Sequence, residues 1–159
     1  MTVHLVTLRE EKEARRFERE RAEEPALKLD PRKLAAALSA VVKGEVRFGD
    51  GDRALYATDG SNYRQAPIGV VLPKDEDDVI RGLEVCRRFG APVLSRGGGT
   101  SLAGQACNEA VIFDMTKYFK QIVEIDADRR LARVRPGLVL DALRSETIKR
   151  GLNFGPDPA

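Results

Sequence analysis

Residues 92–105 read Pro-Val-Leu-Ser-Arg-Gly-Gly-Gly-Thr-Ser-Leu-Ala-Gly-Gln and change character partway along. The first four residues are largely apolar and are typical of a short β-strand. Three consecutive glycines follow at 97–99, and each costs about 0.5–1 kcal/mol of backbone entropy relative to alanine in regular structure. Such a run indicates either a turn with positive φ angles or a backbone that must approach a ligand closely.

The residues around the glycines favour an anionic ligand such as a phosphate. Arg96 precedes the run, Thr100 and Ser101 follow it, and guanidinium and hydroxyl groups donate hydrogen bonds to phosphate oxygens. Two roles stay open for each of them. Arg96 either contacts phosphate or pins the loop, whereas Thr100 and Ser101 either cap a short turn or donate to the ligand. Gly104 and Gln105 complete the loop.

Spacing excludes two common phosphate-binding loops. Gly99 and Gly104 have the separation of a P-loop, but Gln105 stands where that motif requires lysine. A Rossmann fingerprint that starts at the first glycine of the run would need a third glycine at Leu102. Only ten residues separate Gly99 from the apolar segment 110–114, and a crossover with a helix usually takes at least ~10–12. We therefore expect the loop backbone to hold the ligand.

The elements on either side of the loop predict a β-α-β unit. Residues 68–72 are a continuous apolar run, typical of a strand buried on both faces. Asp75, with Asp78 three residues later, caps a helix whose predicted apolar face is Val79, Leu83, Cys86 and Phe89. The segment 92–95 is the next strand, so the two strands are expected to be parallel. The glycine loop leaves the carboxyl end of that strand, where open α/β sheets bind ligands.

The regions before and after this unit have different patterns. Residues 1–50 are expected to form a charged helical lead, with a solvated helix or docking arm at 8–24 and a second helix from Pro31 towards Gly44. Residues 121–126 and 130–135 flank a short polar connection and predict an antiparallel hairpin. A helix is predicted over 138–150, with Leu140, Leu143 and Thr147 facing inward.

Composition limits the class of protein. The 159 residues suit one domain or part of one, and the net charge of +2 is too small to indicate a nucleic-acid partner. The sequence has no apolar run long enough for a transmembrane segment and no secretory signal at its start, so we expect a cytoplasmic protein. Cys86 and Cys107 lack metal-ligand spacing, and His4 is the single histidine. No catalytic or metal site is therefore predicted within these residues.

Taken together, Arg96 to Gln105 resemble the pyrophosphate loop of FAD-binding domains of the p-cresol methylhydroxylase/vanillyl-alcohol oxidase type. Within that group the match is to the N-terminal part of FAD-linked oxidases similar to glycolate oxidase and D-lactate dehydrogenase. The resemblance covers about residues 59–159. It implies that loop amides surround the FAD diphosphate at Arg96, Gly97, Gly98, Gly99, Thr100, Ser101, Gly104 and Gln105. It also implies further cofactor contacts at Pro136, Gly137, Pro156 and Asp157.

The same resemblance implies an α+β fold and a division of the chain. A small parallel β-α-β subdomain is followed by the start of a second, mainly antiparallel subdomain, and a helical lead precedes both. Residues 51–159 are expected to be the N-terminal part of an FAD-binding domain that continues beyond Ala159. The substrate-binding domain and any catalytic residues would lie there too, so residues 1–159 alone are expected to be inactive.

For the whole protein, the resemblance implies an FAD-dependent oxidoreductase that oxidises a 2-hydroxy acid such as D-lactate or glycolate. FAD is expected to be non-covalent, because the loop has no histidine and Cys107 is more typical of a small buried side chain than of a flavin thioether. The resemblance leaves open an iron–sulfur cluster beyond Ala159 and peripheral attachment to the inner membrane. Nothing in the residues identifies the electron acceptor. The alternatives are a flavin reductase of the cell-wall precursor type and a non-catalytic nucleotide-binding or interaction module.

Overall fold

The computed structural model describes residues 29–156. The helix expected at residues 8–24 and the candidate contact Asp157 lie outside the described residues. The described elements are, in chain order, α2 (Pro31–Ser39), β1 (Glu45–Arg47), α3 (Asp50–Leu55), β2 (Gly69–Leu72), α4 (Glu76–Arg88), β3 (Val93–Arg96), β4 (Val111–Asp114), β5 (Ile122–Asp126), β6 (Leu131–Val134) and α5 (Leu140–Ile148).

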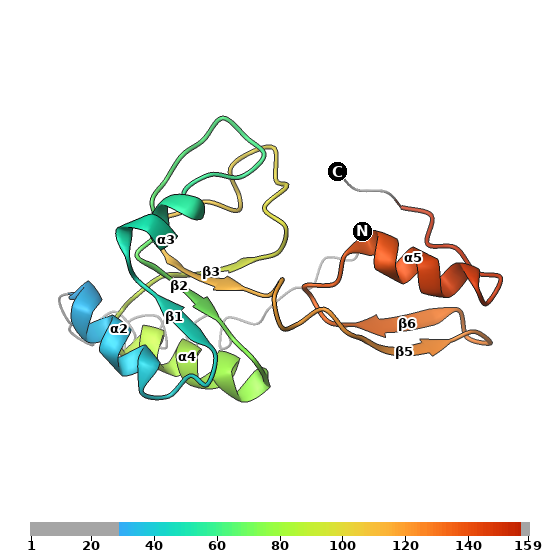
Figure 1. The fold of residues 1–159 in the computed structure, drawn as a ribbon, viewed down its shortest axis with the longest axis horizontal. Helices are drawn as coiled ribbons and strands as arrows, with labels where there is room; N and C mark the ends of the chain where they lie inside the picture. The colour runs from blue at the N-terminus through green and yellow to red at the C-terminus, as the bar shows by residue number, and fades with distance from the viewer. Residues whose placement is uncertain (1–28, 157–159) are drawn as a thin grey trace, which may run out of the picture.

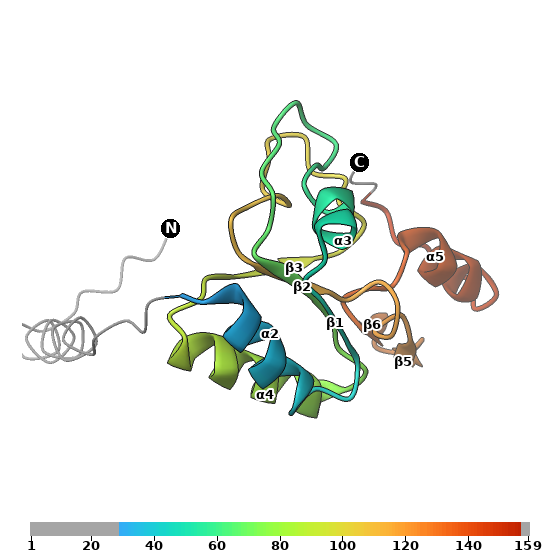
Figure 2. The same cartoon turned by 60° about the vertical axis from the view of Figure 1, so that its left-hand side comes forward.

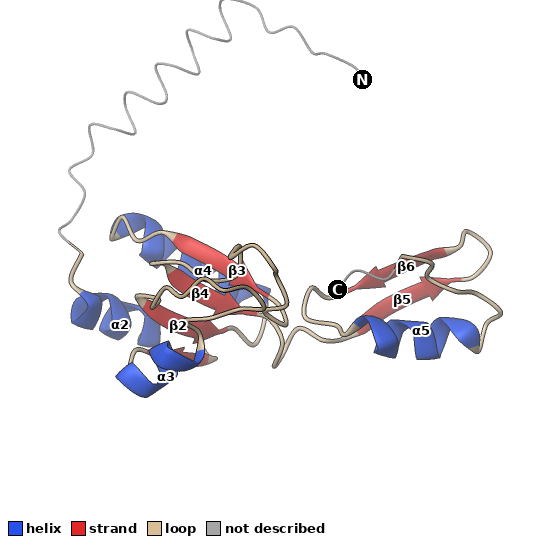
Figure 3. Ribbon diagram, turned by 90° about the horizontal axis from the view of Figure 1, so that it is seen from above, coloured by secondary structure: helices blue, strands red, loops and turns tan. Residues whose placement is uncertain are grey.

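Two separate sheets divide these elements into two subdomains (Figure 1). The first sheet has four strands in the order β1-β2-β4-β3, and β2 and β3 both run parallel to β4. The second sheet is the antiparallel pair β5-β6, with α5 beside it (Figure 3). This arrangement confirms the predicted α+β class and the order of a parallel unit followed by an antiparallel one.

The two strands of the predicted β-α-β unit are parallel but are not neighbours. Strand β4 lies between them, so that Ile112 pairs with Val70 on one side and with Leu94 on the other. All four residues of β4 are buried, as suits a central strand, whereas β3 alternates between exposed and half-buried residues, as suits an edge. Strand β4, the last of the three parallel strands in chain order, therefore lies between the other two.

Residues 30–47, which were assigned to the N-terminal lead, contribute α2 and β1 to the first subdomain. The Asp30 carboxylate accepts a hydrogen bond of 2.9 Å from the backbone N–H of Arg32 and so caps α2 as predicted. Leu34 and Leu38 are fully buried. Strand β1 pairs antiparallel with β2 and forms one edge of the sheet.

Helices α2 and α4 cover one face of the four-stranded sheet (Figure 2). The face of α4 that packs inward is formed by Asp78, Gly82, Val85 and Cys86. The prediction that Leu83 faces inward is wrong, because its side chain is 43% exposed. Gly82 faces β4 instead, because it has no side chain and lets the helix approach the strand closely. A Cβ at Gly82 would lie only 2.9 Å from the ring of Phe113.

In the second subdomain, the hairpin and helix lie where they were predicted. The connection between β5 and β6 contains Arg130 with a φ of 55°, which a tight turn requires. On α5, Leu143 and Thr147 are buried and Leu140 is half-buried. None of the helices in the described part of the chain has the length and apolar character needed to span a membrane.

Candidate functional site

The glycine loop extends from the carboxyl end of β3 and has no regular secondary structure over residues 97–110, all of them described. It stands beside a second irregular segment, residues 57–66, on the side of the sheet opposite α2 and α4 (Figures 1 and 2). We call residues 57–66 the brace segment and residues 97–107 the glycine loop. No helix occurs in residues 97–110, as expected from the short spacing between Gly99 and the segment 110–114.

The glycines of the loop fall into two groups. Gly99 and Gly104 have φ angles of 68° and 80°, which side chains other than glycine rarely adopt. A Cβ on Gly104 would also lie 2.8 Å from the ring of Tyr63. By contrast, a Cβ on Gly97 would have no atom within 4 Å, and one on Gly98 would meet only the Thr100 methyl group at 3.6 Å. Neither packing nor positive φ therefore explains glycine at 97 and 98.

Arg96 pins the loop to its surroundings in this structure. Its Nη1 donates to the carbonyl oxygens of Ala106 at 2.8 Å and Tyr56 at 3.4 Å, and its Nη2 donates to that of Thr58 at 2.9 Å. The guanidinium also stacks over the Tyr56 ring, 5.3 Å from its centre. Of the two roles left open for this arginine, pinning is the one that these contacts realise.

The next two polar residues of the loop bond to each other. The Ser101 hydroxyl donates to the side-chain oxygen of Gln105, and the Gln105 backbone N–H donates back to the same hydroxyl at 3.3 Å. These contacts close a small ring at the exposed end of the loop. Thr100 is exposed between the glycine run and Ser101.

Asp59 is a polar residue of this region that the sequence reasoning missed. Its Oδ1 accepts from the Ser61 backbone N–H at 2.9 Å and from the Ser61 hydroxyl at 2.5 Å, and its Oδ2 accepts from the Ala106 N–H at 3.1 Å. The hydrogen bonds from Ser61 hold the pKa of Asp59 below its usual value. The Asp-Gly-Ser spacing is typical of a turn closed by an aspartate side chain and could have indicated the bonds to Ser61.

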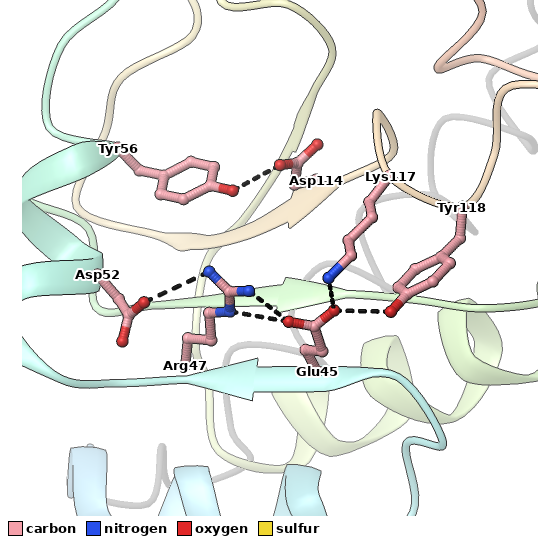
Figure 4. Close-up of polar contacts among 7 residues, drawn as sticks. All are labelled: Glu45, Arg47, Asp52, Tyr56, Asp114, Lys117 and Tyr118. Atoms are coloured by element: carbon pink, nitrogen blue, oxygen red, sulfur yellow. Dashed lines mark hydrogen bonds and ion pairs between the residues drawn. The ribbon is translucent and has the colours of Figure 1, made fainter.

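A buried carboxylate lies below the loop at the end of β4 (Figure 4). Asp114 accepts from the Tyr56 hydroxyl at 2.6 Å and from the backbone N–H and hydroxyl of Thr116 at 2.8 and 2.7 Å. Burial, together with the hydrogen bond to Asp114, raises the pKa of Tyr56 to about 12. The Tyr56 hydroxyl therefore stays protonated and acts as a donor, and its ring carries the guanidinium of Arg96.

The remaining predicted contacts lie at different distances from the loop. Gly137 is buried, its N–H donates to the Phe119 carbonyl at 2.7 Å, and a Cβ there would collide with the backbone of Met115. The Met115 N–H donates in turn to the carbonyl of Arg96 at 3.1 Å, so Gly137 is connected to the base of the loop. Pro136 is exposed beside Gly137.

Pro156 belongs to a different part of the structure. Its carbonyl accepts a hydrogen bond of 3.1 Å from Arg144 on α5, in the second subdomain. The structure thus brings together the residues from Arg96 to Gln105 and connects Gly137 to them through Met115, whereas Pro156 packs against α5.

Comparison with known proteins matches residues 67–159 to a protein-family model described as an FAD binding domain. The chain is 32% identical over 133 residues to D-2-hydroxyglutarate dehydrogenase of Pseudomonas putida, a match that covers 80% of this chain and 13% of that protein. It is 37% identical over 135 residues to the glycolate oxidase subunit GlcD of Escherichia coli, which covers 82% of this chain and 27% of the subunit.

Among solved structures, p-cresol methylhydroxylase has a similar fold. The TM-score is 0.65 at 19% identity, and the match covers 76% of this chain and 25% of that one. At this identity the similarity concerns the fold alone. The chain spans between 13% and 27% of the lengths of these three proteins.

Proposed function

Because this chain belongs to the FAD-binding domain family, we propose that its glycine loop binds the diphosphate of FAD in an oxidoreductase that oxidises a 2-hydroxy acid. Both relatives described above carry a 2-hydroxy acid in their names, as 2-hydroxyglutarate or glycolate. These names favour this substrate class over the precursors of a cell-wall flavin reductase. The lengths of the relatives support the expectation that substrate-binding groups lie outside residues 1–159.

The observation that carries the proposal is the open backbone at Gly97 and Gly98. Both glycines are exposed, and a methyl group on either would meet no close neighbour in this structure. Alanine is therefore compatible with the loop itself, and a reason for glycine must come from something that approaches the loop. A diphosphate in contact with backbone N–H groups needs that approach, as in other glycine-rich phosphate loops.

The residues of this chain would hold and orient the cofactor. Backbone amides of the glycine loop would donate to the diphosphate, with Thr100 and Ser101 as further donors beside it. Arg96 would contribute positive charge while it keeps its hydrogen bonds to the carbonyls of Thr58 and Ala106. FAD, when bound, supplies the ring system that takes up the hydride from the substrate.

Several finer expectations from the sequence belong to this proposal. They are non-covalent FAD, cofactor contacts at Pro136, Gly137, Pro156 and Asp157, and a cytoplasmic location. An iron–sulfur cluster in a C-terminal region stays a prediction of the resemblance alone.

The test of the loop is the variant Gly97→Ala in the intact protein. We expect the variant to raise the Kd for FAD at least about tenfold, since about 1.4 kcal/mol is lost when one close backbone contact is blocked. Urea unfolding of the cofactor-free protein is expected to be unchanged, because the methyl group meets no atom within 4 Å. Fluorescence titration of the cofactor-free protein with FAD provides the measurement.

Gly51→Ala is the matched control, because a Cβ at Gly51 on α3 also has no atom within 4 Å and lies outside the glycine loop. This variant is expected to keep wild-type FAD affinity. If Gly97→Ala binds FAD as tightly as Gly51→Ala does, the loop is not the diphosphate site. The substrate class is tested by adding 2-hydroxyglutarate, glycolate or lactate enantiomers to the FAD-loaded protein without oxygen. A flavin absorbance that none of them bleaches would contradict the proposed substrate class.

A further inference from the structure

We infer that the brace segment, residues 57–66, holds the glycine loop in the shape that receives the diphosphate, and that Asp59 is its main positioning residue. The inference rests on the proposed FAD binding of the glycine loop. It concerns a segment that precedes the span of the family match, which begins at residue 67.

Hydrogen bonds join the brace segment to both ends of the glycine loop. Directly before the loop, Arg96 at the end of β3 donates to the carbonyl of Thr58 at 2.9 Å. At the far end of the loop, the Ala106 N–H donates to the Asp59 carboxylate at 3.1 Å. The residues of these pairs are 38 and 47 positions apart in the chain, so the contacts are tertiary and fix the loop at two points.

The two segments also pack closely between those points. A Cβ on Gly60 would lie 3.1 Å from the carbonyl oxygens of both Thr100 and Ser101. The Tyr63 ring lies against Gly104, where a Cβ would approach it to 2.8 Å. The brace segment therefore contacts the glycine loop along its length, and a displacement of one displaces the other.

The negative charge of Asp59 allows a positioning role to be distinguished from a direct electrostatic effect on the diphosphate. A carboxylate beside a loop that binds a diphosphate repels the ligand, although Arg96 offsets part of that repulsion. If charge were its only contribution, removal of Asp59 would strengthen FAD binding. If Asp59 instead positions the loop by accepting from Ala106, its removal would weaken FAD binding because the loop must then be ordered when the ligand binds.

The experiment compares three variants of the intact protein in cofactor-free form. Asp59→Ala is expected to raise the Kd for FAD about tenfold, because a loop without this contact must be ordered when FAD binds. Asp59→Asn removes the charge but keeps one side-chain oxygen, which accepts from the Ala106 N–H only if the amide NH2 faces Ser61, and it is expected to recover part of that affinity. Asn62→Ala alters an exposed side chain of the same segment and is expected to match the wild type.

Two further measurements separate positioning from general stability. Urea unfolding of the cofactor-free Asp59→Ala protein is expected to stay close to wild type, since Asp59 lies in a peripheral loop outside both apolar cores. If that variant does not fold, Gly60→Ala provides an independent test: it keeps the Asp59 hydrogen-bonding groups, moves the two segments apart, and is expected to weaken FAD binding at least about threefold.

The outcomes are distinguishable from a failure of the proposed function. Wild-type protein that does not bind FAD would overturn both proposals. Wild-type protein that binds FAD, together with Asp59→Ala and Gly60→Ala variants that bind it equally well or more tightly, would overturn the positioning role alone. An Asp59→Asn variant that binds FAD more tightly than the wild type would also contradict the positioning role, because the charge of Asp59 would then outweigh its hydrogen bonds.

Discussion

At the scale of single residues, Asp78 joins three segments of the first subdomain. Its side chain is fully buried and accepts from the backbone N–H groups of Lys43 at 2.8 Å, Gly44 at 2.9 Å and Lys74 at 2.9 Å. Lys43 and Gly44 belong to the turn after α2, and Lys74 lies between β2 and α4. A charge in the core is stabilised in this way by donors that surround it.

We predict that Asp78→Ala lowers the free energy of unfolding by about 3 kcal/mol or more, because buried backbone donors then lose their acceptor. Urea unfolding followed by circular dichroism measures the change. Asp77→Ala, which removes an exposed carboxylate of the same helix turn, is the control and is expected to cost less than about 1 kcal/mol. Equal stabilities of the two variants would show that the buried hydrogen bonds are not needed.

At the scale of elements, a polar cluster holds β1 against the segment that follows β4 (Figure 4). Glu45 on β1 accepts from the Tyr118 hydroxyl at 2.7 Å, from Lys117, and from Arg47 Nε at 3.1 Å. These hydrogen bonds lower the pKa of Glu45 from its ordinary value of 4.5 to about 2, and the bond from Lys117 contributes most to this shift. An edge strand of three residues thus gains contacts beyond its ladder to β2.

The lowered pKa of Glu45 can be tested by measuring the free energy of unfolding at acidic pH. Because the folded-state pKa is depressed, the stabilisation by Glu45 is complete above pH 4.5 and is lost as the pH falls towards 2. Glu45→Gln is expected to lower the free energy of unfolding by about 1 kcal/mol at pH 7. This deficit relative to wild type is expected to shrink as the pH falls from 4.5 towards 2. Glu84→Gln on the exposed side of α4 is the control. A Glu45→Gln deficit that is independent of pH would contradict the assignment.

At the scale of the whole molecule, the second subdomain exposes much of its apolar surface. Leu131, Val134 and Phe154 are 55%, 38% and 42% exposed. They line, with Leu140 and Leu143, an open cavity of about 440 Å³ beside the two-stranded sheet. A hairpin and one helix bury too little apolar area to be an independent core, and exposed patches of this kind are typical of contact surfaces.

We predict that the 159-residue chain binds an apolar fluorescent dye at this surface, and that Leu131→Lys weakens dye binding while it changes the free energy of unfolding by about 0.5 kcal/mol or less. Ile148→Lys is the matched control, because Ile148 is 63% exposed but does not line the cavity. Dye titrations of the three proteins at equal concentration provide the measurement. A larger loss of dye binding in the Ile148 variant would place the surface elsewhere.

The local features of the fold could be predicted because each depends on residues a few positions apart. The caps at Asp30 and Asp75 accept from N–H groups two or three residues later, and the hairpin and α5 follow from patterns within 30 residues. The glycine run likewise indicated a loop whose backbone is open to a ligand.

The sequence by itself determined the order of the helices and strands around the glycine run, since these follow from backbone propensities and local periodicity, and its resemblance to a known family implied the α+β class and the diphosphate loop. Only the tertiary structure decided that β4 enters between β2 and β3, that Arg96 donates to three carbonyls, and that Asp59 reaches Ala106. Each of these contacts joins groups that are brought together by the burial of apolar strands, so no local pattern in the chain encodes the partner.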